Sequence, residues 1–304
     1  MTDKIAVLLP CYNEEKAIAK VIADFKKYLP KADIYVYDNN STDKTAEIAK
    51  KAGAIVRFEP CQGKGNVVRR MFADIDADIY VMSDGDETYD IKRAPELIKT
   101  LKENQIDMLV GARKEKEIEC YRAGHRLGNV LLTKLVQTFF SHKLKDMLSG
   151  YRVFSKRFVK TFPAQSMGFE IETELTVYAL SSKMPIMEVE TDYFARPEGS
   201  FSKLSTYKDG IRILKTIGTL VKEERPVLFF SLIALFFFAL ATALALPIIA
   251  EYINSGLVPR LPTAVLITGI AICSVVCMLV GFILDSIANA KKEVRRQAYL
   301  RYKI

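Results

Sequence analysis

The sequence predicts an α/β fold with a Rossmann-like, mostly parallel sheet, followed by amphipathic helices and a two-helix transmembrane hairpin. Over residues 1–100, short apolar strand patterns alternate with amphipathic helix patterns, which is the order of βαβ units with parallel strands. Two later segments, 227–250 and 261–284, carry no charged residue. At a rise of about 1.5 Å per residue, each is long enough to cross a hydrocarbon core of about 30 Å.

The first strand and helix are predicted from apolar periodicity. A strand is expected over Ile5–Leu9, where an apolar run is closed by Pro10. A helix is expected over Glu14–Tyr28, because its apolar residues recur at helical spacing and form one face. That face holds Ile18, Val21, Ile22 and Phe25.

The alternation continues to a strand that ends on acidic residues. Its elements are a strand at 34–37, a helix ending at 51, a strand at 54–58, a helix at 66–75 and a strand that runs into Asp84. Thr42 or Asp43 caps the first of these helices, and Gly63-Lys64-Gly65 opens the second.

Two carboxylates, Asp84 and Asp86, stand one residue apart where the last of these strands ends. Ligands of open α/β sheets bind beyond the carboxyl ends of the strands. These side chains are therefore expected to hold a divalent metal, Mg²⁺ or Mn²⁺, that bridges the phosphates of a substrate. Acidic surface turns produce the same pattern, so the pattern alone does not establish a metal site.

Other strand ends carry groups that suit a nucleotide. Asp38 can accept hydrogen bonds from a base or a ribose, and Lys64 stands between two glycines at a helix start that suits phosphate. Taken alone, Gly63-Lys64-Gly65 also fits a plain loop. A Rossmann dehydrogenase is disfavoured, because Pro10-Cys11-Tyr12-Asn13-Glu14 follows the first strand where that fold has a glycine-rich turn.

The basic residues predict how the chain sits in a membrane. The formal net charge is +8, and Lys and Arg crowd the stretch before the first apolar segment and the tail after the second. The connecting loop, 251–260, offers only Arg260. By the positive-inside rule, both termini and the region before residue 226 face the cytoplasm of a multi-pass protein of the cell membrane. Met1–Lys4 leads directly into a strand, which disfavours a signal peptide.

Charge and cysteine usage narrow the partners. The basic surplus beside the apolar segments favours anionic lipid and phosphate, and no nucleic-acid module is recognisable. There are five cysteines, none with metal spacing in the cytoplasmic part, and a reducing compartment argues against disulfides. His125 and His142 are isolated, and both are expected to be surface or packing residues.

The expected domains are an α/β domain over 1–204, an amphipathic helix over 205–225, two transmembrane helices within 226–286 and a basic tail over 287–304. Arg122–Ser141 and Tyr207–Val221 combine an apolar face with basic residues, like helices that lie in the headgroup layer. Ordinary packing against the sheet is the alternative for both.

Several motifs also occur in a known order. The first are Pro10–Glu15, Asp38–Asp43, Gly63–Gly65 and Asp84–Asp86. They resemble the signatures of inverting glycosyltransferases of family 2, which have the GT-A fold. The later ones are Gly111–Arg113, Arg122–Asn129, Asp146–Arg152, Gly168–Glu170 and Arg196–Lys203. These resemble the polyprenyl-phosphate branch, which includes dolichol-phosphate mannose synthase and bacterial polyprenyl-phosphate glucosyltransferases.

The resemblance implies a role for each matching residue. The residues implied in nucleotide binding are Pro10, Tyr12, Glu14, Asp38, Lys64 and Asp84. The implied metal ligands are Asp84 and Asp86. The residues implied around the acceptor phosphate and donor diphosphate are Arg113, Arg126, Arg196, Ser200 and Lys203. Asp146 occupies the family's catalytic acidic position, and Asp86 is expected to act in catalysis with it.

The chain departs from the pattern at one position. Dolichol-phosphate mannose synthases place a glutamine two residues after the second metal aspartate, and this chain has Thr88 there. Glu87 and Tyr89 are the alternatives for a third metal ligand. Mannose as the transferred sugar therefore does not follow from the resemblance.

The resemblance implies transfer of one hexose, of glucose or mannose type, from a UDP- or GDP-linked sugar to a polyprenyl phosphate, with inversion at the anomeric carbon. The acceptor phosphate is already ionised near neutral pH, so Asp146 is expected to orient arginines and metal rather than to remove a proton. The alternatives are an N-acetylated or amino sugar donor, and a catalytically silent, membrane-tethered module that binds nucleotide or lipid. The sequence leaves a homo-oligomer open.

Overall fold

The computed structural model describes residues 3–115, 132–139, 145–197, 199 and 206–302. The chain forms two compact units, Met1–Ile217 with Arg295–Ile304, and Gly218–Val294. The domain boundaries expected from the sequence are at residues 204, 225 and 286. The first unit thus also takes in part of the expected amphipathic helix and the end of the expected tail.

In the first unit, the described residues form one seven-stranded sheet in the order β3-β2-β1-β4-β6-β5-β7. The strands are β1 (Ile5–Cys11), β2 (Asp33–Asp38), β3 (Ile55–Phe58), β4 (Ile79–Met82), β5 (Met108–Glu115), β6 (Arg152–Ser155) and β7 (Ile186–Tyr193). β6 runs antiparallel to β4 and β5, and the other neighbours are parallel. The mostly parallel sheet predicted from the sequence is confirmed.

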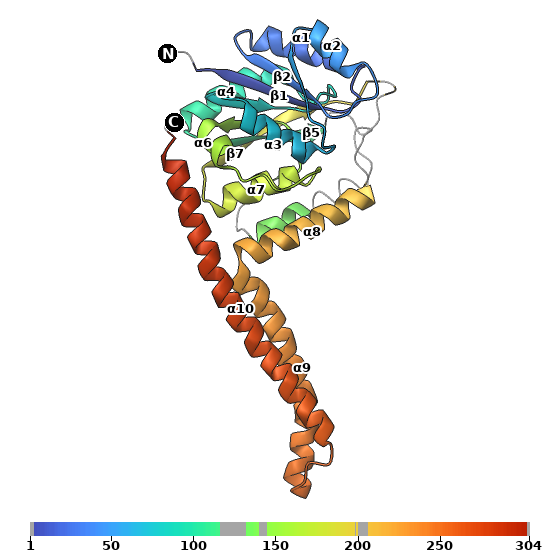
Figure 1. Ribbon diagram of the computed structural model, residues 1–304, viewed down its shortest axis with the longest axis vertical. Coiled ribbons are helices and arrows are strands. Elements are labelled where there is room, and N and C mark those ends of the chain that lie inside the picture. The colour runs from blue at the N-terminus through green and yellow to red at the C-terminus, as the bar shows by residue number, and fades with distance from the viewer. Residues whose placement is uncertain (1–2, 116–131, 140–144, 198, 200–205, 303–304) are drawn as a thin grey trace. The chain divides into compact units, whose positions relative to one another are not determined.

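Helices cover both faces of this sheet (Figure 1). They are α1 (Ile18–Tyr28), α2 (Thr45–Lys51), α3 (Lys64–Asp74), the short 3₁₀ helix η1 (Ile91–Arg93), α4 (Ala94–Glu103), α6 (Lys156–Thr161) and α7 (Ile171–Ser181), and residues 132–139 are also helical. Val7 and Leu9 of β1 pack with α1 and α4, whereas Ala6 and Leu8 pack with α3, α6 and α7. This alternation follows from the two-residue period of a strand, and burial on both faces is typical of parallel sheets.

The predicted apolar face of the first helix is confirmed. Its members, all fully buried, are Ile18, Val21, Ile22 and Phe25. The predicted start of that helix at Glu14 is wrong, because Glu14–Ala17 form a turn and α1 begins at Ile18. This turn keeps Glu14 at the end of β1 instead of carrying it into the helix.

The first strand continues through Pro10 to Cys11, whereas the sequence predicts its end at Leu9. β4 pairs with β1 only as far as Leu8, whose carbonyl accepts the Ser83 N–H. Pro10, two residues further on, faces the same side beyond the end of that pairing. Its missing N–H therefore removes no ladder hydrogen bond, which is the condition under which a strand tolerates proline.

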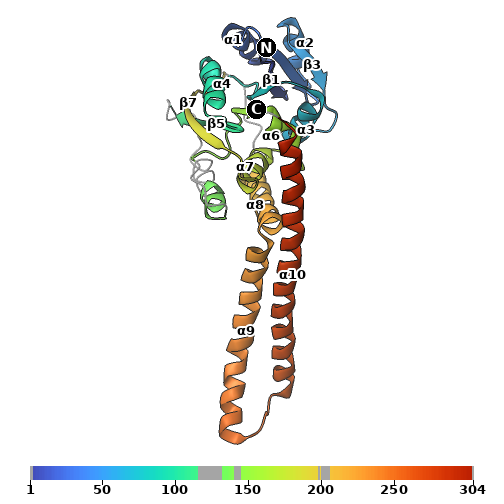
Figure 2. The same ribbon diagram turned by 90° about the vertical axis from the view of Figure 1, so that its left-hand side faces the viewer.

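The second unit contains most of two long helices, α9 (Pro226–Ser255) and α10 (Leu261–Leu300). Within the described residues, these are the two helices that are long and apolar enough to cross a membrane, as the uncharged segments predict. They run side by side (Figures 1 and 2). Small residues line their contact: the Ser274 hydroxyl donates to the Ala234 carbonyl over 2.8 Å.

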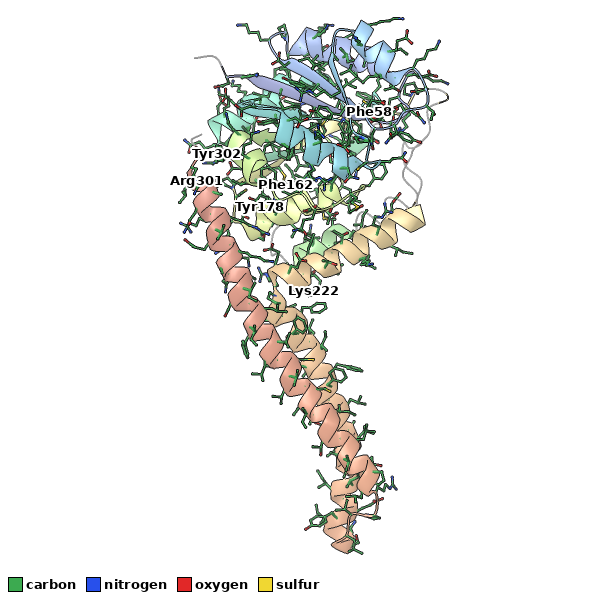
Figure 3. All side chains as sticks on the ribbon, viewed as in Figure 1. Phe58, Phe162, Tyr178, Lys222, Arg301 and Tyr302 are labelled. Carbon is green, nitrogen blue, oxygen red and sulfur yellow. The ribbon has the colours of Figure 1, made fainter. Side chains whose placement is uncertain are left out.

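The last residues of α10 belong to the first unit, where Tyr299 packs against the core. The Tyr299 hydroxyl donates to the fully buried Asp107 over 2.7 Å. The Arg157 guanidinium pairs with Asp107 and lies 4.6 Å from the centre of the Tyr299 ring. Arg295 lies 5.7 Å from the centre of the ring of Tyr178. Figure 3 labels Tyr178 and, near the end of α10, Arg301 and Tyr302. The end of the expected basic tail is thus anchored on the α/β unit.

Tyr299→Phe tests this anchor. We expect the free energy of unfolding to fall by about 1–3 kcal/mol, because a buried Asp107 oxygen loses its donor. For a unit of this size, the apparent melting temperature of the full chain in detergent should fall by about 2–8 °C. Tyr252→Phe, whose tyrosine is 55% exposed, is the control. Equal melting temperatures for the two variants would contradict the anchor.

Candidate active site

The carboxyl ends of β1, β2 and β4 meet at one edge of the sheet, because these strands are parallel neighbours. The side chains that follow them form an acidic cluster around Cys11. Burial raises the pKa of the Cys11 thiol, and four carboxylates raise it further. They are Glu14, Asp38, Asp84 and Asp86. Cys11 therefore stays a neutral thiol at neutral pH, and it is not a candidate nucleophile.

Side chains tie together the loops after β1 and β2. The Asn13 N–H donates to the Ser41 hydroxyl over 2.9 Å, and the Asn13 side-chain carbonyl accepts the Thr42 N–H over 2.8 Å. The Glu14 N–H donates to the Thr45 hydroxyl over 2.8 Å. Asn13 has a φ of 54°, in the left-handed region where asparagine is enriched. The two loops thus form one connected wall of the site.

Asp38 is buried in this wall and has an acceptor atom to spare. Its Oδ2 accepts the Ser41 N–H over 3.3 Å. Its Oδ1 is buried and has no hydrogen-bond partner among the described residues. Since an unsatisfied buried acceptor is costly, an N–H or O–H of a ligand would be favourable there. Pro10, near the end of β1, and Tyr12, just after the strand, are also expected in the nucleotide pocket, and both are half-buried.

The Gly63-Lys64-Gly65 segment is held by close backbone contacts. The Gly63 N–H donates to the Asn39 side chain over 2.6 Å. A Cβ on Gly65 would stand 2.1 Å from the Ser166 carbonyl oxygen, and one on Gly63 would stand 2.2 Å from that of Met167. Both positions therefore require glycine. These contacts fix the start of α3, and with it the position of Lys64 in the site.

Lys64 is buried between two carboxylates. Its Nζ lies 2.5 Å from Asp84 Oδ1 and 2.6 Å from Oε1 of Glu172, which stands in the first turn of α7. Burial alone would lower the pKa of Lys64, but Asp84 and Glu172 outweigh it and raise that pKa above its usual value. The ammonium therefore stays charged. Gly150 packs behind the pair, since a Cβ there would stand 2.7 Å from Asp84 Oδ2.

Asp86 is buried and engaged at both oxygens. Arg196 pairs with its Oδ2, and the Thr88 hydroxyl donates to its Oδ1 over 2.6 Å. Burial raises the pKa of Asp86, Asp84 raises it further, and Arg196 opposes both effects. The resemblance assigns Arg196 to the phosphates. In the structure, this guanidinium forms an ion pair with Asp86, the second predicted metal ligand, and its NH1 lies 3.8 Å from Glu14 Oε1.

The residues considered for a third metal ligand have other partners. Glu87 pairs with Lys20, and the Tyr89 hydroxyl accepts a backbone N–H. In the part of the chain that the structure describes, no three His, Cys, Asp or Glu side chains gather to hold a metal. Asp84 and Asp86 nonetheless suit a hard cation whose other ligands are phosphate oxygens and water, as is usual for Mg²⁺.

Asp146 forms a two-pronged ion pair with Arg113. The guanidinium Nε lies 2.6 Å from Asp146 Oδ2, and its NH2 lies 2.7 Å from Oδ1. The backbone N–H groups of Asp146 and Lys145 donate to the Glu188 carboxylate over 3.1 and 2.6 Å. Arg113 also lies 5.5 Å from the centre of the Tyr193 ring. Charged hydrogen bonds of this kind fix both the predicted catalytic carboxylate and the arginine.

Residues 6–162 match the family described as glycosyl transferase family 2. The chain belongs to glycosyltransferase family 2. It is 30% identical over 293 residues to glycosyltransferase AglJ of Haloferax volcanii, with 96% of each protein covered. It is 28% identical over 224 residues to the dolichyl-phosphate hexose transferase of the same organism, which covers 73% of this chain and 96% of that protein.

The fold also matches solved structures. One is the glucosyl-3-phosphoglycerate synthase of Mycobacterium tuberculosis in complex with Mn²⁺, UDP-glucose and phosphoglyceric acid. Its TM-score is 0.60 at 22% identity, and the match covers 72% of this chain and 79% of that one. At this identity the likeness supports the fold alone, and the predicted GT-A-like fold is confirmed. The acidic strand ends are therefore the candidate active site of a family 2 glycosyltransferase.

Glu172 and Glu188 are not among the site residues predicted from the sequence. Glu172 lies in a helix whose residues Ile171–Ala179 are all buried, and an acid in such a segment needs a buried partner. The burial of this whole helix would have pointed to Glu172. However, α7 is too short for its sequence alone to reveal that the helix is buried on all sides. Glu188 shares β7 with Glu190 and Asp192, and this alternation is typical of a solvated face.

Part of the predicted acceptor site lies outside the described residues. These residues are Arg126, Ser200 and Lys203. The two histidines expected at the surface or in packing, His125 and His142, also lie outside the described residues. Of the expected amphipathic segment Arg122–Ser141, the structure describes only residues 132–139, which are helical.

Gly65→Ala tests the packing of the lysine loop. Within a helix, alanine is favoured over glycine by about 1 kcal/mol. Here we expect destabilisation instead, by about 1–3 kcal/mol, because a backbone carbonyl stands where the methyl group would go. Thermal unfolding of the full chain in detergent measures it. Gly210→Ala in α8 (Thr206–Glu224) is the matched control, since nothing lies within 4 Å of a Cβ there. A Gly65→Ala protein as stable as the control would refute the packing argument.

Proposed function

We propose that this family 2 glycosyltransferase transfers one hexose from a nucleotide sugar to a polyprenyl phosphate at the cytoplasmic face of the membrane, with inversion at the anomeric carbon. The related dolichyl-phosphate hexose transferase is named for such an acceptor. The two long apolar helices suit an enzyme whose acceptor is a lipid.

One observation carries the proposal: Asp84 and Asp86 follow β4 at the same edge where buried Asp38 has a spare acceptor atom. A nucleoside diphosphate has the complementary groups. Its base or ribose offers N–H and O–H donors for Asp38, and its diphosphate carries charge that Lys64 and Arg196 can meet. The site therefore matches both ends of the donor.

Asp84 and Asp86 would hold the divalent cation, Mg²⁺ or Mn²⁺. Their fit rests on the chemistry of the donor set, because two hard carboxylates leave room for phosphate oxygens to complete the coordination. When bound there, the cation neutralises negative charge on the leaving diphosphate. The M. tuberculosis enzyme of similar fold was crystallised with Mn²⁺ and UDP-glucose, and we propose the same class of cation for this chain.

The residues of the chain would position the acceptor. Its phosphate oxygen is ionised near neutral pH, so no strong base is needed. Both oxygens of Asp146 accept from Arg113, and this suits an acid that aims a guanidinium fork at an anion. Arg196, a second fork, is 25% exposed and lies beside Asp86, so it is accessible to the diphosphate or to the incoming phosphate. Holding the reactants together in this way lowers the barrier by orientation.

The helix α8 would lie in the headgroup layer. Its Ile213 and Ile217 are buried, at 3% and 1% exposure, whereas Ile211 and Leu214 are 69% and 52% exposed. This second, exposed apolar face is what an interfacial helix needs, and Arg212 beside it suits anionic lipid. Positive charge on one side of the hairpin supports a cytoplasmic position for both termini.

This proposal has two alternatives. In the first, the reaction is the same but the donor sugar is N-acetylated or carries an amino group. In the second, the protein is a catalytically silent, membrane-tethered module that binds nucleotide or lipid. Asp86, Asp146 and Glu172 are buried at a cost, and each has a basic partner, which argues against the silent module. A screen of UDP- and GDP-linked sugars with a polyprenyl phosphate acceptor distinguishes these cases by product formation.

Asp86→Asn tests the metal site. We expect turnover to fall at least about a hundredfold, because neutralising the leaving diphosphate is worth several kcal/mol. Sugar transfer to polyprenyl phosphate is measured with Mg²⁺, with Mn²⁺ and with chelator. Asp76→Asn, at a 71% exposed side chain, is the control and should keep wild-type turnover. An Asp86→Asn enzyme that is fully active in the presence of chelator would contradict the proposed metal site.

Ser255→Cys tests the topology. Ser255 ends α9, and the proposal puts it outside the cell. In a background without other cysteines, a thiol reagent that does not cross membranes should label it on intact cells. A protein that keeps only the exposed Cys61 is the control, and it should be labelled only after permeabilisation. The reverse pattern would mean the opposite orientation.

A further inference from the structure

Glu172 differs from the two other glutamates near the start of α7. Glu170 and Glu174 accept backbone N–H groups of residues 165–168 over 2.7–3.2 Å, so they hold that loop. The Glu172 carboxylate accepts no backbone group among the described residues. Its Oε1 lies 2.6 Å from Lys64 Nζ, and its Oε2 is buried without a hydrogen-bond partner in the described part of the chain.

Lys64 links Glu172 to the candidate metal site, because its ammonium contacts both Glu172 and Asp84. Its Nζ lies 2.5 Å from Asp84 Oδ1, so the ammonium connects the Glu172 carboxylate of α7 to the Asp84 carboxylate at the end of β4. Gly150 closes the space behind them, since a Cβ at that position would stand 2.9 Å from Lys64 Nζ. Lys64 is therefore confined, and the two carboxylates share its charge.

We infer that Glu172 is a positioning residue: by sharing the Lys64 ammonium, it leaves Asp84 available to a divalent cation. This rests on the proposed function, in which Asp84 and Asp86 hold that cation. An ammonium with two anionic partners is held less tightly by each than an ammonium with one. Glu172 also adds negative charge close to the site, which favours a cation.

Loss of the charge at position 172 should therefore weaken cation binding for two reasons of the same sign. Lys64 would be left with Asp84 as its partner and would compete with the cation for it. The site would also carry one negative charge fewer. A glutamate that merely supported the fold would lower the amount of folded protein without changing the affinity of what remains.

The test is a titration of the full chain in detergent with Mn²⁺ in the presence of UDP, with free Mn²⁺ measured by electron paramagnetic resonance. Glu172→Gln, which keeps the shape and removes the charge, should raise the Kd for Mn²⁺ at least about fivefold. Glu47→Gln is the control, since Glu47 is an exposed partner of Lys51 on α2, and its Kd should equal that of the wild type. An unchanged Kd for Glu172→Gln overturns the inference.

The route through Lys64 is tested in a Lys64→Met background. There, Glu172→Gln should raise the Kd by a clearly smaller factor than in the wild-type background, because the competing ammonium is gone and only the loss of one negative charge still acts. A shift of the full size in that background overturns the positioning role. If Glu172→Gln does not fold, Glu172→Asp decides, because it keeps the charge but withdraws it from Lys64. A raised Kd supports the inference, and an unchanged one overturns it.

The same titration separates this inference from the proposed function. Wild-type protein that binds no Mn²⁺ with UDP present would remove the proposed metal site and the inference together. Wild-type protein that binds Mn²⁺ as tightly as Glu172→Gln does would remove the inference alone.

Discussion

The burial of carboxylates at one edge of the sheet is the constraint on which this site depends. Taking an ionised acid out of water costs several kcal/mol unless a partner replaces the lost hydration. Three acids in the site are at most 5% exposed, and each has a basic partner. The pairs are Asp86 with Arg196, Asp146 with Arg113, and Glu172 with Lys64. Because the partners come from distant parts of the chain, these ion pairs form only when the domain folds. The same ion pairs therefore stabilise the fold and assemble the site.

Three glycines allow close packing around the charged residues of the site. Gly65 admits the Ser166 carbonyl, Gly150 admits the Lys64–Asp84 pair, and a Cβ on Gly85 would stand 2.6 Å from Cys11 Sγ. Each of these glycines lies next to a charged residue of the site or contacts one. The family motifs therefore combine a charged group with a residue that makes room for its partner. A larger residue at position 150 would push Lys64 and Asp84 apart, and a buried charge without its partner is costly.

How much the sequence could predict depends on how local each signal is. Strand and helix alternation and the uncharged segments are local, and the sheet and the helices α9 and α10 confirm them. The position of Asp84 at a strand end is local in the same sense. The contact between Lys64 and Glu172 exists only once α7 packs on the sheet, and Tyr299 meets Asp107 across 192 positions. Periodicity carries no record of such pairs.

Position 88 illustrates how a departure from the family pattern can be accommodated. The Thr88 hydroxyl and backbone N–H both donate to Asp86 Oδ1, over 2.6 and 3.2 Å, while Arg196 holds the other oxygen. A glutamine carries its side-chain oxygen two bonds further from the backbone, so the two residues cannot act on the same atom in the same way. Threonine here orients Asp86 and adds no ligand of its own. In the proposed metal site, the coordination that glutamine would complete would fall to substrate oxygens and water, which is how Mg²⁺ sites with few carboxylates are usually filled.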